Sequence, residues 1–169
     1  MAGLKELRTR IETIKSTEKI TSAMKMVAAA RLRRSQGLIE KCRFYNNNIL
    51  ASANRVLFEL RQEEQKKNVR FVYPELMRGS GKAENYLLLV FTSDRGLCGS
   101  YNSNVAREAS KRIEELLGSG KNVKILCIGK KGRDILKRKY AGMIVDTIEG
   151  IARKGAKYYE AVDLGQRVL

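Results

Sequence analysis

The segment "SDRGLCGSYNSN" (residues 93–104) holds the residues whose types and spacing come closest to a chemical site. It follows a continuous apolar run, and Gly96 and Gly99 would let a backbone approach a phosphate near the start of a helix. The third glycine of a dinucleotide-binding motif and the lysine of a phosphate-binding loop are both missing. We therefore favour the other interpretation, a tight strand-to-helix turn capped by Ser100 or Ser103.

The sequence contains no histidine, which excludes more chemistry than any other feature. A Ser-His-Asp triad, a Cys-His pair and a histidine metal ligand are all impossible. Cys42, Cys98 and Cys127 are scattered and form no CxxC pair, which is typical of free thiols in a reducing compartment. We expect no catalytic residue, no metal and no cofactor in this chain.

Composition favours a single domain of ordinary size with an appendage, because the chain has 169 residues and 43% apolar residues. The formal charge of +16 indicates an anionic partner, such as nucleic acid, a membrane surface or an acidic protein face. The first twenty residues lack an apolar signal-peptide core and include three glutamates. We expect a cytoplasmic chain of bacterial type.

These residues need elements to position them, and the first half of the chain predicts one long helix over residues 1–61. Between Leu4 and Leu60 there is no proline and a single glycine, Gly37. Apolar residues alternate steps of three and four at both ends, as in a coiled-coil seam. The seam positions are Leu4, Leu7, Ile11, Ile14, Ile49, Ala53, Val56 and Leu60. Such a helix needs a partner helix.

The second half predicts a Rossmann-like parallel α/β domain over residues 86–169, after a linker at 62–85 that contains the only proline. Strands are expected at 86–91, 123–129 and 142–148, with helices near 102–117, up to residue 139, and within 152–169. The chain ends before a further strand, so we expect the sheet to be incomplete at its C-terminal end. The basic run at 129–139 is either a phosphate-binding patch or a solvated helix face.

Residues 23–30 ("AMKMVAAA") place apolar side chains on every side of the helix, where an ordinary surface helix has one stripe. Met24 and Met26 point in nearly opposite directions. The nearby cations are also spread around the axis, and no aromatic residue precedes Phe44, which favours a protein sleeve over nucleic acid. Packing of both methionines inside a helical hairpin remains the alternative.

The segments "IETIKSTEKITSAMKMVAAARLRRSQ" and "FTSDRGLCGSYNSNV", followed by "IGKKGRD", resemble the gamma subunit of the bacterial F-type ATP synthase. The resemblance implies a non-catalytic rotor of the central stalk that couples proton-driven rotation to conformational change in the beta subunits. It implies contacts with the alpha and beta subunits, the epsilon subunit and the membrane rotor ring of c subunits. The location would be the cytoplasmic face of the inner membrane, as a peripheral protein.

The resemblance also assigns roles to residues. Met24 matches the shaft position that faces an acidic loop of a beta subunit, and its neighbours match the same contact zone. The implied contact set is Met24, Lys25, Met26, Val27, Ala28, Arg31 and Leu32. The family-motif loop consists of Ser93, Asp94, Arg95, Gly96, Leu97, Cys98 and Gly99.

One departure is large, because family members normally continue for more than a hundred residues and supply the second shaft helix. A truncated product, a split chain or a divergent protein would each account for this. Two other functions also stay open: a basic nucleic-acid-binding protein with a helical arm, and a small nucleotide-binding α/β protein that uses the loop at residues 93–100.

Overall fold

The computed structural model describes residues 3–73, 81–151 and 157–169 of the chain. The chain divides into two compact units, Met1–Val72 and Tyr73–Leu169. The first unit is a single helix with the turn that follows it. The second unit is a small parallel α/β domain.

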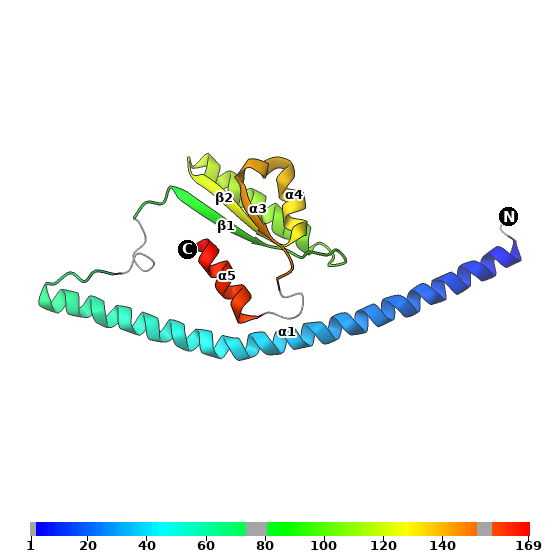
Figure 1. Cartoon of the computed structure of the whole chain (residues 1–169), viewed down its shortest axis with the longest axis horizontal. Coiled ribbons are helices and arrows are strands. Elements are labelled where there is room, and N and C mark those ends of the chain that lie inside the picture. Colours follow the sequence, from blue (N-terminus) through cyan, green and yellow to red (C-terminus); the bar gives the residue numbers. More distant parts are fainter. Residues whose placement is uncertain (1–2, 74–80, 152–156) are drawn as a thin grey trace. The chain divides into compact units, whose positions relative to one another are not determined.

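Helix α1 (Leu4–Lys67) is one continuous, gently curved helix of 64 residues, about 95 Å long at ~1.5 Å per residue (Figure 1). It ends at Asn68, which adopts a left-handed conformation with φ 52°. The predicted end at residue 61 is therefore wrong, and the predicted linker at 62–85 begins too early. Residues 62–67 ("QEEQKK") are polar, yet each is a good helix former and none breaks the helix.

Threonine side chains follow one path along the first part of α1. The hydroxyls of Thr9, Thr13, Thr17 and Thr21 each donate to the carbonyl four residues earlier, at 2.9–3.1 Å. Such bonds satisfy the hydroxyl inside the helix and often bend it. These four threonines therefore have no free hydroxyl proton to donate to a partner.

The second unit is built on a three-stranded parallel sheet in the order β1-β2-β3. Strand β1 is Asn85–Phe91, β2 is Asn122–Ile128 and β3 is Ile144–Ile148. A register shift between Ile125 and Leu126 interrupts the pairing of β2 with β3. The sequence prediction of a long helix followed by a parallel α/β domain is confirmed.

Helices α3 (Tyr101–Gly118) and α4 (Lys130–Tyr140) pack against each other on one face of the sheet. The core lies beneath them, and Ile113, Ile125, Cys127 and Leu136 are at most 1% exposed. A single 3-10 turn, η1 (Ala141–Met143), leads into β3. The predicted strand at 142–148 therefore starts slightly later than expected.

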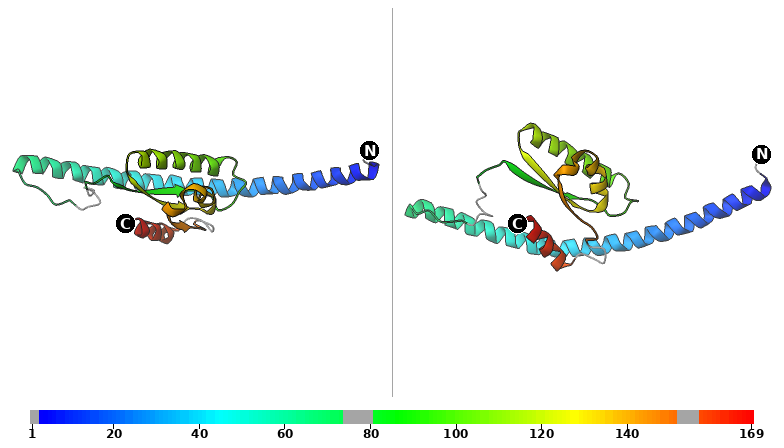
Figure 2. Two further views of the ribbon diagram at one scale, coloured as in Figure 1. Left: turned by 90° about the horizontal axis from the view of Figure 1, so that it is seen from above. Right: turned by 45° about the horizontal axis from the view of Figure 1, so that its top comes forward.

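Helix α5 (Tyr158–Val168) lies on the side of the sheet opposite α3 (Figures 1 and 2). An ion pair of 2.9 Å between Arg167 Nη1 and Asp146 Oδ2 joins it to β3. Part of the helix predicted within 152–169 falls on residues 152–156, which are outside the described residues. None of the helices in the described ranges combines the length and hydrophobicity that a membrane span requires.

Candidate functional site

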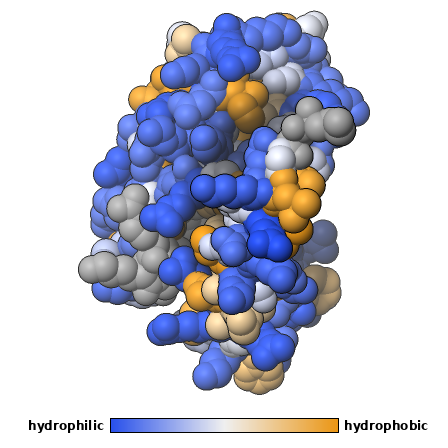
Figure 3. Space-filling view, turned by 90° about the vertical axis from the view of Figure 1, so that its right-hand side faces the viewer, coloured by the Kyte–Doolittle hydropathy of each residue, from blue (hydrophilic) through white to orange (hydrophobic). Residues whose placement is uncertain are grey.

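The first candidate site is the middle of α1, where large apolar side chains are exposed to solvent. Met24, Met26 and Leu32 are 50%, 65% and 58% exposed, and α1 has no buried residue. Val27 is similarly exposed, so apolar groups face several directions around the axis. The sequence prediction placed these residues in contact with a partner, and this remains a prediction. Hydrophilic side chains dominate the face of the molecule shown in Figure 3, with hydrophobic groups scattered among them.

The same part of α1 carries five cations within a stretch that contains no acidic residue. No aspartate or glutamate lies between Glu18 and Glu40. The intervening cations are Lys19, Lys25, Arg31, Arg33 and Arg34. Within the described ranges, none of their side chains forms an ion pair or hydrogen bond. The segment is therefore a positive, apolar cylinder whose charges are available to an acidic surface.

The coiled-coil seam is also exposed, and the unbroken helix relates its two ends. Leu4 is 73% exposed and Ile14 is 61% exposed. Ile14 and Ile49 are separated by a whole number of heptads, so both ends of the seam follow one register. The shared register can be read from the sequence alone if the helix is continuous from one end of the seam to the other. One partner helix in one register would therefore meet both ends.

The second candidate site is the motif loop (residues 93–99), which lies against the start of α4. Thr92 Oγ1 accepts from Gly132 N at 2.8 Å, and the carbonyl of Ser93 accepts from Lys131 N at 3.0 Å. Asp94 Oδ1 accepts from Lys130 N at 3.1 Å. These three bonds tie the end of β1 to the first turn of α4.

The start of α4 has no backbone donor left for a bound phosphate. Gly129 N donates to the carbonyl of Ile148 at 2.9 Å, so all of the first four N–H groups of this helix have acceptors from the chain itself. A phosphate at this edge of the sheet would need those donors. This arrangement weighs against the nucleotide-binding alternative.

The side chain of Asn102, in the first turn of α3, connects the two ends of the motif loop. Its Nδ2 donates to Ser93 Oγ at 2.8 Å and to Cys98 Sγ at 3.0 Å, and its Oδ1 accepts from Ser93 N at 3.0 Å. Asn102 is 8% exposed and is the one buried polar residue in the described core. Ser93 Oγ also donates to the carbonyl of Arg95. Sequence reasoning missed Asn102.

The predicted cap of α3 differs from the observed one. Ser100 occupies the N-cap position, but its side chain makes no capping bond to the backbone. Its Oγ instead accepts from Asn104 Nδ2 at 3.1 Å. The predicted tight turn is instead a loop of nine residues (92–100) between β1 and α3. The predicted capping role of Ser100 is also wrong, because the side-chain amide of Asn104 donates to its hydroxyl oxygen.

Leu97 stands at the exposed tip of the motif loop in an unusual conformation. Its φ is 63°, and its side chain is 92% exposed. A left-handed φ costs a non-glycine residue about 1–2 kcal/mol. The bonds made by Ser93, Asp94 and Asn102 hold the loop in this shape.

The basic helix α4 is partly neutralised by nearby carboxylates. Arg133 Nη1 lies 2.8 Å from Glu149 Oε1, and its Nη2 lies 3.0 Å from Asp134 Oδ1. The hydrogen bond from Arg133 lowers the pKa of Asp134 below its ordinary value. Lys139 pairs with Glu114 on α3, and this contact lowers the pKa of Glu114. These pairs favour the solvated-face interpretation of this run.

The thiols are in three different environments. Cys42 is exposed on α1, Cys98 is half-buried in the motif loop, and Cys127 is buried in β2. Burial raises the pKa of the Cys127 thiol. Among the described residues, no cluster of histidine, cysteine, aspartate or glutamate could hold a metal ion.

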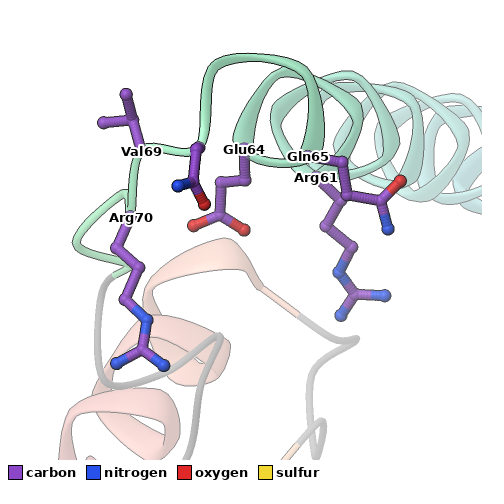
Figure 4. A pocket seen from close by; sticks show the side chains of 6 residues that line it. Arg61, Glu64, Gln65, Val69 and Arg70 are labelled. Carbon is purple, nitrogen blue, oxygen red and sulfur yellow. The ribbon is translucent and has the colours of Figure 1, made fainter.

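A shallow pocket lies where α1 ends. Figure 4 shows the side chains of Arg61, Glu64 and Arg70 on its wall. The remaining lining residues are Gln65, Asn68 and Val69. Phe71 N donates to Glu64 Oε1 at 2.8 Å, so the carboxylate holds the turn that follows the helix. The pocket is a consequence of this helix end.

Comparison with known proteins gives consistent matches over the whole chain. A family model described as ATP synthase matches residues 3–169. The ATP synthase gamma chain of Sinorhizobium medicae is 41% identical over 169 residues, which cover 100% of this chain and 56% of that protein. The gamma chain of Gluconobacter oxydans is 44% identical over 168 residues, covering 99% of this chain and 55% of that protein.

A solved structure is also similar. It is a cryo-EM structure of the central stalk and c-ring of the mitochondrial ATP synthase of Tetrahymena thermophila. The TM-score is 0.61 and the identity 30%, over 88% of this chain and 58% of that chain. The chain thus spans about half the length of the relatives that it matches.

Proposed function

The chain belongs to the ATP synthase family, and because its curated relatives are gamma chains, we propose that it acts as the amino-terminal part of a central-stalk rotor subunit. In this proposal, proton flow turns the rotor, and α1 transmits the rotation to catalytic beta subunits. The similarity to a central-stalk structure supports this role. The single observation that carries it is the exposed, apolar and unpaired positive segment in the middle of α1.

The proposed partners follow from the two units. Helix α1 would enter a ring of alpha and beta subunits, and the α/β domain would face the epsilon subunit and the c-ring. The chain would have no active site of its own and would be located at the cytoplasmic face of the bacterial inner membrane. The spread of cations around α1 supports a protein partner over nucleic acid, because a groove-bound helix concentrates its charge on one side.

The contact segment suits a part that must turn. Small alanines and flexible methionines give shallow, adaptable contacts, so no single angle becomes a deep energy minimum. Each exposed ion pair contributes only about 0–1 kcal/mol. A rotating cation such as Arg31 can therefore leave one acidic group and meet the next at low cost. Stiffness and shape of α1 would carry the torque, with charge adjusting it.

The exposed seam supports a second helix in the working rotor. Apolar side chains at Leu4, Leu7, Ile11 and Ile14 face solvent in the chain by itself. A long helix gains most of its stability from packing an apolar face. We infer that a partner helix pairs with both ends of this seam in the shared register.

The test of this function is coupling in membrane vesicles that carry an assembled complex. The chain would be joined to the remaining part of a relative's gamma chain and co-expressed with the other subunits. Met24→Lys adds a cation at the proposed beta contact. We expect ATP hydrolysis to continue with fewer protons pumped per ATP.

Leu50→Lys is the matched control, because Leu50 is 58% exposed on the same helix but lies outside the contact segment. It should leave the ratio of pumped protons to hydrolysed ATP near that of the unmodified complex. Unchanged coupling in the Met24→Lys complex would show that this position makes no close contact with a beta subunit.

A further inference from the structure

The Asp94 carboxylate joins two loops that are far apart in sequence. Its Oδ1 accepts from Lys130 N at the start of α4 at 3.1 Å. Its Oδ2 accepts from Gly150 N, just after β3, at 2.8 Å. One side chain at the end of β1 therefore holds the segments that follow β2 and β3.

This position has a known chemical preference in parallel α/β folds. Ligand anions bind beyond the carboxyl ends of the strands, where the N–H groups of a helix start and its positive dipole end are directed. In this chain the carboxylate of Asp94 supplies the negative charge at the start of α4. Helix α4 has 11 residues and no acidic residue of its own in its first turn, so Asp94 supplies the charge that its N-terminus favours.

We propose that Asp94 is an internal anion that takes the phosphate position of this fold and thereby positions the motif loop. The strained tip of the loop depends on it, because Leu97 keeps a φ of 63° only while both ends of the loop are held. Asn102 holds both ends of the loop, through Ser93 and Cys98, and Asp94 holds the loop to α4 and to Gly150. The loop therefore has a fixed shape without any bound ligand.

The three thiols give an internal readout of this role. Cys98 Sγ accepts from Asn102 Nδ2 in the motif loop, Cys127 is 0% exposed in the core, and Cys42 is exposed on α1. The experiment is peptide-resolved alkylation of the full chain, comparing Asp94→Ala with the unmodified protein. Asp94→Ala removes the hydrogen bonds from Lys130 N and Gly150 N to the carboxylate, which hold the motif loop in place. We therefore expect the loop to open more often and Cys98 to react about tenfold faster or more. Cys42 and Cys127 should keep their rates.

Two controls separate positioning from general destabilisation. Glu115→Ala removes an exposed carboxylate of α3, which pairs with Arg112, and should leave Cys98 unchanged. An equal acceleration of Cys127 and Cys98 in Asp94→Ala would mean that the whole domain opens, which would overturn the positioning role. No change at Cys98 would also overturn it.

Asp94→Asn tests the two-oxygen geometry by amide hydrogen exchange. The asparagine keeps one acceptor oxygen and replaces the other with a donor. We expect one of the Lys130 and Gly150 amides to lose protection in this variant and both to lose it in Asp94→Ala. Protection of both amides in Asp94→Ala would contradict the proposal.

Inorganic phosphate tests the anion position. Millimolar phosphate should slow the alkylation of Cys98 in Asp94→Ala, because the vacated helix start can then bind a free anion. It should have no effect on the unmodified chain, where the carboxylate occupies the site. If phosphate does not change the alkylation rate of Cys98 in Asp94→Ala, the proposal that Asp94 takes the place of a bound phosphate is wrong.

Discussion

Gly129→Ala should be the most destabilising glycine substitution among those described, because two costs meet at this position. Gly129 has a φ of 105°, a conformation that costs other residues on the order of 1–3 kcal/mol. A Cβ atom there would lie 2.2 Å from the carbonyl oxygen of Thr92 and 2.8 Å from its Oγ1. Neither atom can move freely, since Thr92 directly follows β1 and is held by hydrogen bonds of its backbone N–H and its Oγ1.

The cost of relieving that overlap follows from the bonds that hold Thr92. Thr92 N donates to the carbonyl of Ile128 at 2.7 Å, and Gly132 N donates to Thr92 Oγ1 at 2.8 Å. Losing each contributes about 1 kcal/mol. Together with the backbone strain, we expect a loss of about 3–5 kcal/mol in the free energy of unfolding. A small domain has only about 5–15 kcal/mol in total.

The assay is urea unfolding of the full chain, followed by the reactivity of Cys127. This thiol is 0% exposed in the second unit, so its exposure reports that unit separately from α1. With a denaturant slope of ~1–3 kcal/mol per molar urea, the midpoint should fall by at least about 1 M.

Gly118→Ala is the control for this prediction. A Cβ at Gly118 meets nothing within 4 Å, and the residue lies in the last turn of α3. Alanine is a better helix former than glycine, so the midpoint should stay or rise. If Gly129→Ala unfolds at the same urea concentration as the unmodified chain, the close approach of Thr92 to Gly129 is wrong.

Three further predictions concern Leu97, Glu114 and Arg31. Leu97→Gly should raise the urea midpoint of the second unit by relieving a left-handed φ, whereas Leu97→Ala should not; equal midpoints would exclude strain there. Glu114→Gln should destabilise this unit at neutral pH. Hydrogen bonds from Lys139 and Tyr140 lower the pKa of Glu114, so the stabilisation is present above the ordinary carboxyl pKa and is lost as pH falls through the lowered value. A difference from the unmodified chain that persists in acid would contradict this assignment. Arg31→Gln should weaken retention on an alpha–beta assembly by less than about tenfold and reduce its salt dependence, since exposed pairs contribute ~0–1 kcal/mol; full retention at every salt concentration would exclude a charge contact.

Local patterns predicted the elements of the fold, because each depends on residues close in sequence. The continuous apolar run of β1 and the absence of helix breakers in α1 required no tertiary information. The predicted end of α1 is too early, because Pro74 and the glycines after it indicate a linker without fixing its first residue. Helix propensity, which is high throughout residues 62–67, decides that boundary instead.

The site at the motif loop could be predicted only in part. Sequence drew attention to Asp94 but gave no sign of its partners, because Lys130 and Gly150 lie 36 and 56 residues away. Asn102 looked like an ordinary helix residue. Gly129, directly after β2, and Gly132, in the first turn of α4, carry the one available signal, since glycine is typical of places where another segment approaches closely.

The central claim is that another molecule surrounds the middle of α1, and the alkylation rate of a thiol at Met24 tests it most directly. Met24→Cys would be compared in the chain alone and in a purified complex with alpha and beta subunits. Because Met24 is 50% exposed in the chain alone, we expect rapid alkylation there. In the complex we expect the rate to fall at least about tenfold, as enclosure excludes the reagent. An equal rate in both samples, with the chain still bound, would contradict the rotor assignment of α1.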